Sequence, residues 1–304
     1  MNVEGLLRTP PPMHAFAAGE NQLVYGRLAR KRDALIRVEG ATMEPGWFHL
    51  GPVGLLQVDR QALGTALSAL LRRLEKVPQQ GSLVAPNAWV RSVVVDAEAV
   101  PRNRQEAEEV VRWRLKKILP CRPEEVRLDF ASGGGNGRIL VVLALDKPLA
   151  AVEETFAAAG VGLGRIEPAV LALSALLPAS TAPVLLAAVE DRALAMAVLA
   201  GGKPVLVRHK PLPSDSARAE IFIHREMSRT LTYARDQENL SGPVTVWLAS
   251  DGVDRDDSMA QWASGENGVL VNRLAAGAGR VPQTAGVPDV RLLSLLGIAW
   301  GGGA

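Results

Sequence analysis

Several residues have the chemistry of a catalytic or metal-binding site, but none stands in the pattern that such a site needs. Cys121 precedes Arg122, a basic neighbour that can lower a thiol pKa. No His or Asn signature of a cysteine nucleophile accompanies it, so a small buried apolar side chain is the favoured interpretation. The four histidines show neither HxxxH nor HExxH spacing and predict no metal site: His14, His49, His209 and His224.

Two further stretches have side chains or backbone suited to ions. The run GGGNG at 133–137 would need a helix directly after it to hold a phosphate, and a strand pattern follows instead. The acidic run DGVDRDD at 251–257 lacks the spacing of an EF-hand and its closing Glu. We therefore expect a flexible hairpin turn and a solvated loop.

The composition excludes some classes of function and favours others. The chain has 304 residues, 48% of them apolar, which suits two lobes better than one small domain. Its 34 Lys and Arg against 32 Asp and Glu leave a net charge of +2, so no nucleic-acid partner is expected. A single cysteine fits a reducing compartment, and we expect the cytoplasm.

One uncharged stretch, 168–189, is long enough to cross a membrane. Pro178 and Pro183 interrupt it, and its parts predict a helix, a loop and a buried strand instead. The first residues, 1–14, hold no long apolar run and predict a flexible lead-in without a secretory signal. We therefore expect no direct membrane span.

The elements of the first half begin with short strands joined by tight turns, near 15–18, 23–30 and 34–43. Asp59 is the predicted cap of a covering helix with one apolar face. Asn103 then caps a helix, predicted over 103–119, with acids in its first turns and bases in its last. After a Pro-Cys-Arg-Pro corner come a hairpin and a helix from Pro148. The stretch 92–167 thus predicts a compact α+β unit.

The same order of elements begins again after Pro183. Strand patterns lead to a hairpin turned at Gly201 and Gly202. A long helix then aligns apolar side chains on one face: Ile223, Met227, Leu231 and Ala234. A buried strand from Val244, one more strand and a final apolar helix, VRLLSLLGIAW, follow. Two lobes that open alike, with an insertion in the first, point to a specific architecture.

That architecture and two local motifs resemble the actin-like fold, in the branch of the type IV pilus assembly protein PilM and its relatives in type II secretion platforms. The helix and corner VRWRLKKILPCRPEEVRLDF is similar to the family's "RWE…IPFP…EEV…D(Y/F)" segment, and REMSRTLTYARDQ resembles its "(R)EI.RSL.(Y/F)YRSQ". The resemblance implies an α/β, ribonuclease H-like fold of two lobes. These are a first lobe at 15–180, with the inserted α+β subdomain 92–167, and a second lobe at 181–304.

Residue by residue, the family's nucleotide motifs are degraded in this chain. Where the first phosphate motif resembles "IDIGxxxVK", Ala17 stands for the Asp, Gly19 remains and Val24 stands for the Lys. In the second motif, "VDIG", Ala188 stands for the Asp and Glu190 for the Gly. The adenosine turn is reduced to ASDG, ending at Gly252. Both Asp residues that would hold hydrated Mg²⁺, the Lys and one of the glycines that admit phosphate are thus missing.

The resemblance implies a pseudo-ATPase, with ATP and Mg²⁺ binding not expected. The alternative is an active actin-like ATPase or kinase in which a shifted alignment recruits neighbouring carboxylates, Glu20, Asp191 and Asp251. Two observations oppose this alternative. An acid beside the phosphate position would repel the nucleotide, and no glycine stands beside Asp191 to admit the phosphate.

The resemblance further implies a cytoplasmic scaffold, held at the inner membrane through a partner. It would bind the N-terminal cytoplasmic tail of a bitopic membrane protein in a groove beside the insertion. Candidate contacts are Trp113, Leu119 and Pro120, although packing of Trp113 against the rest of the fold is the favoured alternative. Arg114 is expected to pair with a carboxylate. Pilus or secretion use, the partner's identity and a homo-oligomer stay open.

Overall fold

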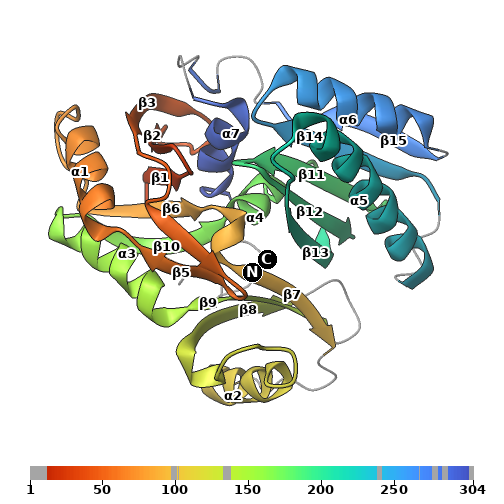
Figure 1. Cartoon of the computed structure of the whole chain (residues 1–304), viewed down its shortest axis with the longest axis horizontal. Coiled ribbons are helices and arrows are strands. Elements are labelled where there is room, and N and C mark those ends of the chain that lie inside the picture. The colour runs from red at the N-terminus through yellow and green to blue at the C-terminus, as the bar shows by residue number, and fades with distance from the viewer. Residues whose placement is uncertain are drawn as a thin grey trace.

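The protein consists of two similar lobes and a small subdomain that extends from the first (Figure 1). The computed structural model describes residues 12–96, 101, 103–132, 138–237, 242–266, 268–275, 280–282 and 287–300. Most of the predicted lead-in and the Gly-rich turn at 133–137 lie outside these residues.

The first lobe is built on a five-stranded mixed sheet. Its central strand, β1, pairs antiparallel with β2 and parallel with β6. Outer strands extend the sheet on both sides, in the order β10-β6-β1-β2-β3. The strands are β1 (His14–Ala18), β2 (Gln22–Leu28), β3 (Leu35–Thr42), β6 (Gln80–Ala85) and β10 (Gly162–Pro168).

The second lobe repeats this topology. Its order is β13-β12-β11-β14-β15, so each lobe places a three-strand meander beside two parallel strands. The strands are β11 (Val184–Glu190), β12 (Ala193–Ala200), β13 (Lys203–Pro211), β14 (Val244–Ser250) and β15 (Val269–Arg273). The predicted hairpin turn is confirmed, since Gly201 and Gly202 both have positive φ, of 57° and 78°. The uncharged stretch 168–189 is a short helix, a loop and β11, as predicted.

Helices cover both faces of each sheet, because the strands alternate their apolar side chains between two cores. In β1, Phe16 points to the outer core, while Ala15 and Ala17 point to the core between the lobes. The outer helices are α1 (Arg60–Leu71), α3 (Asp146–Ala158), α5 (Ser216–Gln237) and α6 (Val253–Gly265). Between the lobes lie α4 (Ala169–Ser174) and α7 (Asp289–Gly297), both visible in the middle of Figure 1.

The predicted helix caps are confirmed. The Asp59 carboxylate accepts from the backbone N–H of Gln61 and Ala62, at 2.9 and 3.0 Å. Asn103 likewise accepts from Gln105, at 2.9 Å.

The inserted subdomain is a three-stranded antiparallel sheet, β7-β9-β8, with α2 on one face. A hairpin of the first lobe packs against its base through Val53. The elements are β4 (Phe48–Gly51), β5 (Gly54–Val58), the 3₁₀ turns η2 (Asn87–Trp89) and η3 (Pro123–Glu125), β7 (Arg91–Asp96), α2 (Arg104–Leu115), β8 (Val126–Ser132) and β9 (Arg138–Leu145).

The end of α2 differs from the prediction. The helix ends at Leu115, four residues before the expected Leu119, and Ile118 is 48% exposed and not in the apolar stripe. The corner is held by Arg112, which donates from Nη1 to the carbonyls of Pro123 and Val126 at 2.5 and 2.9 Å. The chain therefore turns early because this arginine fixes the segment after the prolines to the helix.

Two elements of the predicted unit 92–167 pack outside the small sheet. Strand β10 joins the first-lobe sheet, and α3 contributes Val152 and Phe156 to the core shared with α1. The lobe bounds 15–180 and 181–304 stay predictions. No helix among the described residues is both long and apolar enough for a transmembrane segment.

Candidate functional site

The turn after β1 is the first of two turns that face each other across the lobes. The N–H of Gly19 donates to the carbonyl of Gln22 at 2.9 Å. The indole N–H of the buried Trp47 donates to the carbonyls of Gly19 and Glu20, both at 3.1 Å. The first-lobe turn is thus held in place from within its own lobe.

The second turn joins β11 to β12 and carries two carboxylates, Glu190 and Asp191. Arg291 of α7 lies between the two turns. Its Nε donates to Glu190 Oε1 at 2.7 Å, and its Nη2 lies 2.9 Å from both carboxylate oxygens of Asp191. The third nitrogen, Nη1, donates to Oε1 of Gln22 in the first lobe at 3.2 Å. The guanidinium is therefore shared between the lobes.

This cluster is largely shielded from water. The side chains of Arg291 and Glu190 are 4% and 8% exposed, and that of Asp191 is 20% exposed. Burial raises the pKa of Glu190, and the neighbouring Arg291 opposes that rise. Burial alone would lower the pKa of Arg291, but the two carboxylates outweigh it and raise that pKa. Arg291 is thus a permanent cation in the site.

Gly19 lies directly against this cation. A Cβ added at Gly19 would lie 2.3 to 2.5 Å from three atoms of the Arg291 guanidinium. Because glycine has no side chain, the backbone at Gly19 can lie close to the arginine, just as a glycine lets a backbone lie close to a phosphate.

The other predicted pocket positions lie in β1, β2 and β11 and at the start of α6. Ala17 and Val24 are cross-strand partners in β1 and β2, and both are buried in the core between the lobes. Ala188 is 2% exposed and pairs with Ala195 and Ala249. Gly252 is the N-cap of α6, and its N–H donates to the hydroxyl of Ser250 at 3.3 Å. Ala17, Val24 and Ala188 are therefore buried positions with apolar side chains.

Sequence reasoning missed Arg291. The signal was present, because VRLLSLLGIAW carries one charge in an otherwise apolar helix. Such a charge needs a buried partner. Of the alternative carboxylates, Asp191 joins the cluster through its side chain, whereas Glu20 joins through its backbone N–H, which donates to Asp191 Oδ2 at 2.9 Å. The pKa of Asp251 is raised by burial and lowered in part by Arg255, with which it pairs at 2.6 Å.

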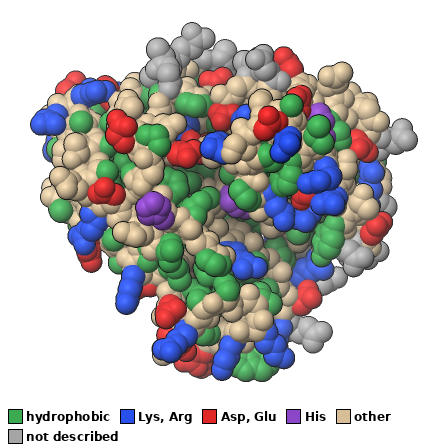
Figure 2. All heavy atoms as spheres, viewed as in Figure 1, with side chains coloured by type: hydrophobic (Ala, Val, Ile, Leu, Met, Phe, Trp, Pro, Cys, Tyr) green, Lys and Arg blue, Asp and Glu red, His purple; other side chains and the backbone are tan. Residues whose placement is uncertain are grey.

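A groove of about 610 Å³ lies where the two lobes meet the insert. Figure 2 shows this face hollowed at its centre, with hydrophobic side chains around the hollow. Its walls come from the β4–β5 hairpin, η2 and β7 on one side and β13 on the other. Both β7 and β13 are edge strands of their sheets. Apolar lining residues include Leu50, Val53, Val93, Val170 and Val207.

The three candidate partner contacts lie on α2 and its corner, and none of them lines this groove. Trp113 is 70% exposed, so the expected packing against the rest of the fold is wrong. Leu119 is half-buried against the insert core, and Pro120 is exposed. Arg114 donates to the backbone carbonyl of Asp96 and pairs with no carboxylate of the described residues, which corrects the expected ion pair. The role of the three residues in binding stays a prediction.

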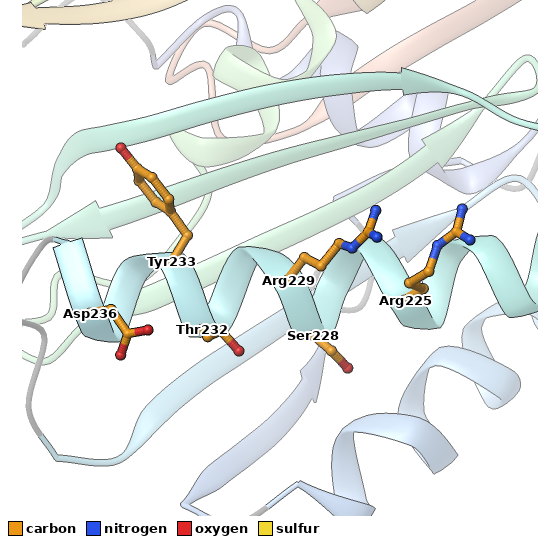
Figure 3. A pocket seen from close by; sticks show the side chains of 6 residues that line it. All are labelled: Arg225, Ser228, Arg229, Thr232, Tyr233 and Asp236. Carbon is orange, nitrogen blue, oxygen red and sulfur yellow. The ribbon is translucent and has the colours of Figure 1, made fainter.

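A shallower hollow follows the outer face of α5 (Figure 3). Six side chains of this one helix line it: Arg225, Ser228, Arg229, Thr232, Tyr233 and Asp236. Arg229 already pairs with the buried Glu226 at 2.9 Å, and Arg225 stacks over Phe222. We assign no site to this helix face.

The other reactive residues take structural roles. Cys121 packs partly into the insert core, and burial raises the pKa of its thiol, so it is not an activated nucleophile. His224 stacks on Trp262 and bonds to Ser258 at 3.0 Å. Among the described side chains, no three His, Cys, Asp or Glu are placed to hold a metal ion together.

The duplicated sheet topology, with α4 and α7 between the lobes, defines an actin-like fold. The structure superposes on the PilM-PilN type IV pilus biogenesis complex with a TM-score of 0.76 and 19% identity, covering 97% of this chain and 98% of that chain. No protein-family model and no curated protein sequence matches the chain.

Two further solved structures share the fold. One is the cytoplasmic domain of EpsL, an inner membrane component of the type II secretion system of Vibrio cholerae. It has a TM-score of 0.53 and 12% identity, with 94% of each chain covered. The other is a protein of unknown function with an actin-like ATPase fold from Bacteroides thetaiotaomicron, with a TM-score of 0.54, 9% identity, and 93% and 94% coverage. The actin-like fold predicted from the architecture and the motifs is confirmed.

Proposed function

We propose that the protein is a cytoplasmic scaffold of a type IV pilus or type II secretion assembly platform at the inner membrane. The observation that carries the proposal is the structural match to the PilM-PilN complex over 97% of the chain. The cytoplasmic domain of EpsL, an inner membrane component of a type II secretion system, shares the fold. This similarity supports the same setting.

The scaffold would bind the N-terminal cytoplasmic tail of a bitopic inner-membrane protein in the groove between the insert and the second lobe. An extended tail could pair its backbone with an edge strand, β7 or β13, and insert apolar side chains among the lining valines. The protein would then be held at the membrane through this partner alone.

The proposal includes a nucleotide pocket that no longer works. Arg291 occupies the space between the two phosphate turns, and its Glu190 and Asp191 partners would repel phosphate. Ala17 and Ala188 cannot hold hydrated Mg²⁺. We therefore propose a pseudo-ATPase without cofactor.

The test of the tail site uses a labelled synthetic peptide of the N-terminal cytoplasmic tail of a candidate bitopic inner-membrane protein from the same organism, and measures fluorescence anisotropy. Leu50→Asp changes a groove residue that is 48% exposed, and we expect it to abolish binding. Leu56→Asp, on the same hairpin, 54% exposed and outside the groove lining, is the matched control. Equal affinity for both variants would place the tail elsewhere.

Calorimetric titration with Mg-ATP tests the degraded pocket separately. We expect no heat of binding in the micromolar range. Micromolar affinity would overturn the pseudo-ATPase proposal and favour the active ATPase, while leaving the tail site to its own test.

A further inference from the structure

We propose that Arg291 is a built-in clasp that replaces a bound nucleotide and holds the two lobes in one fixed arrangement. In an actin-like ATPase, the nucleotide phosphates and their metal lie between two turns, one from each lobe. Here the same space contains a side chain of the chain itself. The inference rests on the proposed pseudo-ATPase pocket and is independent of the proposed partner tail.

The bonding pattern joins the lobes through one planar cation. Two nitrogens of Arg291 bind the second-lobe carboxylates of Glu190 and Asp191, and the third binds Gln22 in the first lobe. Asp191 adds a direct hydrogen bond between the lobes, since its Oδ2 accepts from the first-lobe N–H of Glu20 at 2.9 Å. Because the guanidinium is a rigid fork, these bonds restrict both distance and angle between the turns.

The second turn is strained in order to present Asp191. Asp191 and Arg192 have φ values of 47° and 59°, a left-handed conformation that costs non-glycine residues free energy. The neighbouring hairpin between β12 and β13 makes its tight turn with Gly201 and Gly202 instead. Arg32, in the turn between β2 and β3, is the other described non-glycine residue with a positive φ, of 57°. The strained turn at Asp191 and Arg192 is the one whose side chain contacts Arg291.

Packing of α7 places Arg291 between the turns. Leu292, Leu295 and Leu296 belong to the core formed with the first lobe, whereas Val290 and Leu293 belong to the core formed with the second. Since α7 is buried against both sheets, the arginine cannot leave without disturbing one of them. The lobe arrangement should therefore be insensitive to nucleotide.

The test measures the distance between the lobes in the full-length protein by double electron–electron resonance. Spin labels at Ser68→Cys on α1 and Ser264→Cys on α6, both exposed, report it in a Cys121→Ser background. We expect a narrow distribution that millimolar Mg-ATP leaves unchanged. In the triple variant Arg291→Met/Glu190→Gln/Asp191→Asn, we expect the distance distribution to broaden and to shift to longer distances.

The triple variant removes the cation together with its anions, so no unpaired charge stays buried and the fold is retained. Circular dichroism checks this, and Arg291→Lys serves as a second variant that keeps the charge without the fork. Arg255→Met, which breaks the ion pair with Asp251 within the second lobe, is the control with an unchanged distribution. A distribution as narrow in the triple variant as in the parent, or one that Mg-ATP narrows in the parent, would overturn the clasp.

Discussion

Nε of Arg291 lies 2.7 Å from Oε1 of Glu190, although 101 positions separate the two residues in the chain. Both side chains are almost fully buried, at 4% and 8% exposure. In the proposed pseudo-ATPase, this internal ion pair would take the place of the phosphate-binding glycine. Its energetic consequences can be measured directly.

Arg291→Met should destabilise the folded protein by about 3–5 kcal/mol, because it leaves two buried carboxylates without their cation. Urea denaturation followed by circular dichroism measures the free energy of unfolding. When Glu190→Gln is added to Arg291→Met, it should lower the free energy of unfolding by less than it does in the parent protein. The coupling free energy between the two positions should be about 1–3 kcal/mol. Strictly additive effects would show that the pair does not interact.

Gly19→Ala should also be destabilising, by about 2 kcal/mol or more, although φ at Gly19 lies outside the left-handed region. The reason is space, since the new methyl group would meet the Arg291 guanidinium and displace it. Gly265→Ala is the matched control at the end of α6, where an added Cβ has open space. We expect it to change stability by about 0.5 kcal/mol at most, in the stabilising direction. Similar losses at both glycines would contradict the steric explanation.

Stability should depend on pH through Glu167 in β10. Burial raises its pKa from 4.5 to about 7, although Arg165 pairs with it at 2.6 Å. Because this folded-state pKa lies above the unfolded one, the folded protein holds an extra proton between them. Its stability contribution is therefore fully present below about pH 4.5 and is lost as the pH rises to about 7, with an amplitude of order 3 kcal/mol.

Glu167→Gln isolates that contribution, because the amide keeps the shape and cannot ionise. Urea unfolding at several values between about pH 5 and pH 8 gives the free energy of each protein. As the pH rises, the free energy of unfolding of the variant should increase relative to that of the parent. Parallel pH profiles would mean that Glu167 ionises normally.

The two tryptophans beside the insert should behave in opposite ways. Trp113 is 70% exposed, so Trp113→Ala should change stability by less than about 0.5 kcal/mol. Trp89 is fully buried and lies edge-on to Trp47 and Phe48, so Trp89→Ala should cost about 3–5 kcal/mol. Thermal and urea unfolding measure both.

Trp113→Ala also separates the two surfaces proposed for the partner. With the tail in the groove, the anisotropy assay should give the parental affinity, because Trp113 does not line the groove. A marked loss of affinity would move the binding surface to α2 and its corner.

The sequence by itself determined the local elements and their order. Periodicity placed Ile223, Met227 and Leu231 on the buried face of α5, and the caps Asp59 and Asn103 marked helix starts within one residue. These signals are local, because a helix face and a cap involve residues only a few positions apart. The missing Asp and Lys of the phosphate motifs were equally visible, since they are identities at fixed spacing.

Only the tertiary structure decided what fills the space between the two turns. Arg291 meets Glu190 and Gln22 across 101 and 269 positions, and no local pattern specifies contacts over such distances. The exposure of Trp113 and the early end of α2 at Leu115 likewise depend on long-range packing and on the Arg112 bonds to the corner. From the sequence, a charge in an apolar helix shows that a buried partner must exist. Only the folded chain selects that partner, because the cost of removing the charge from water is offset by groups that are near in space and not near in the sequence.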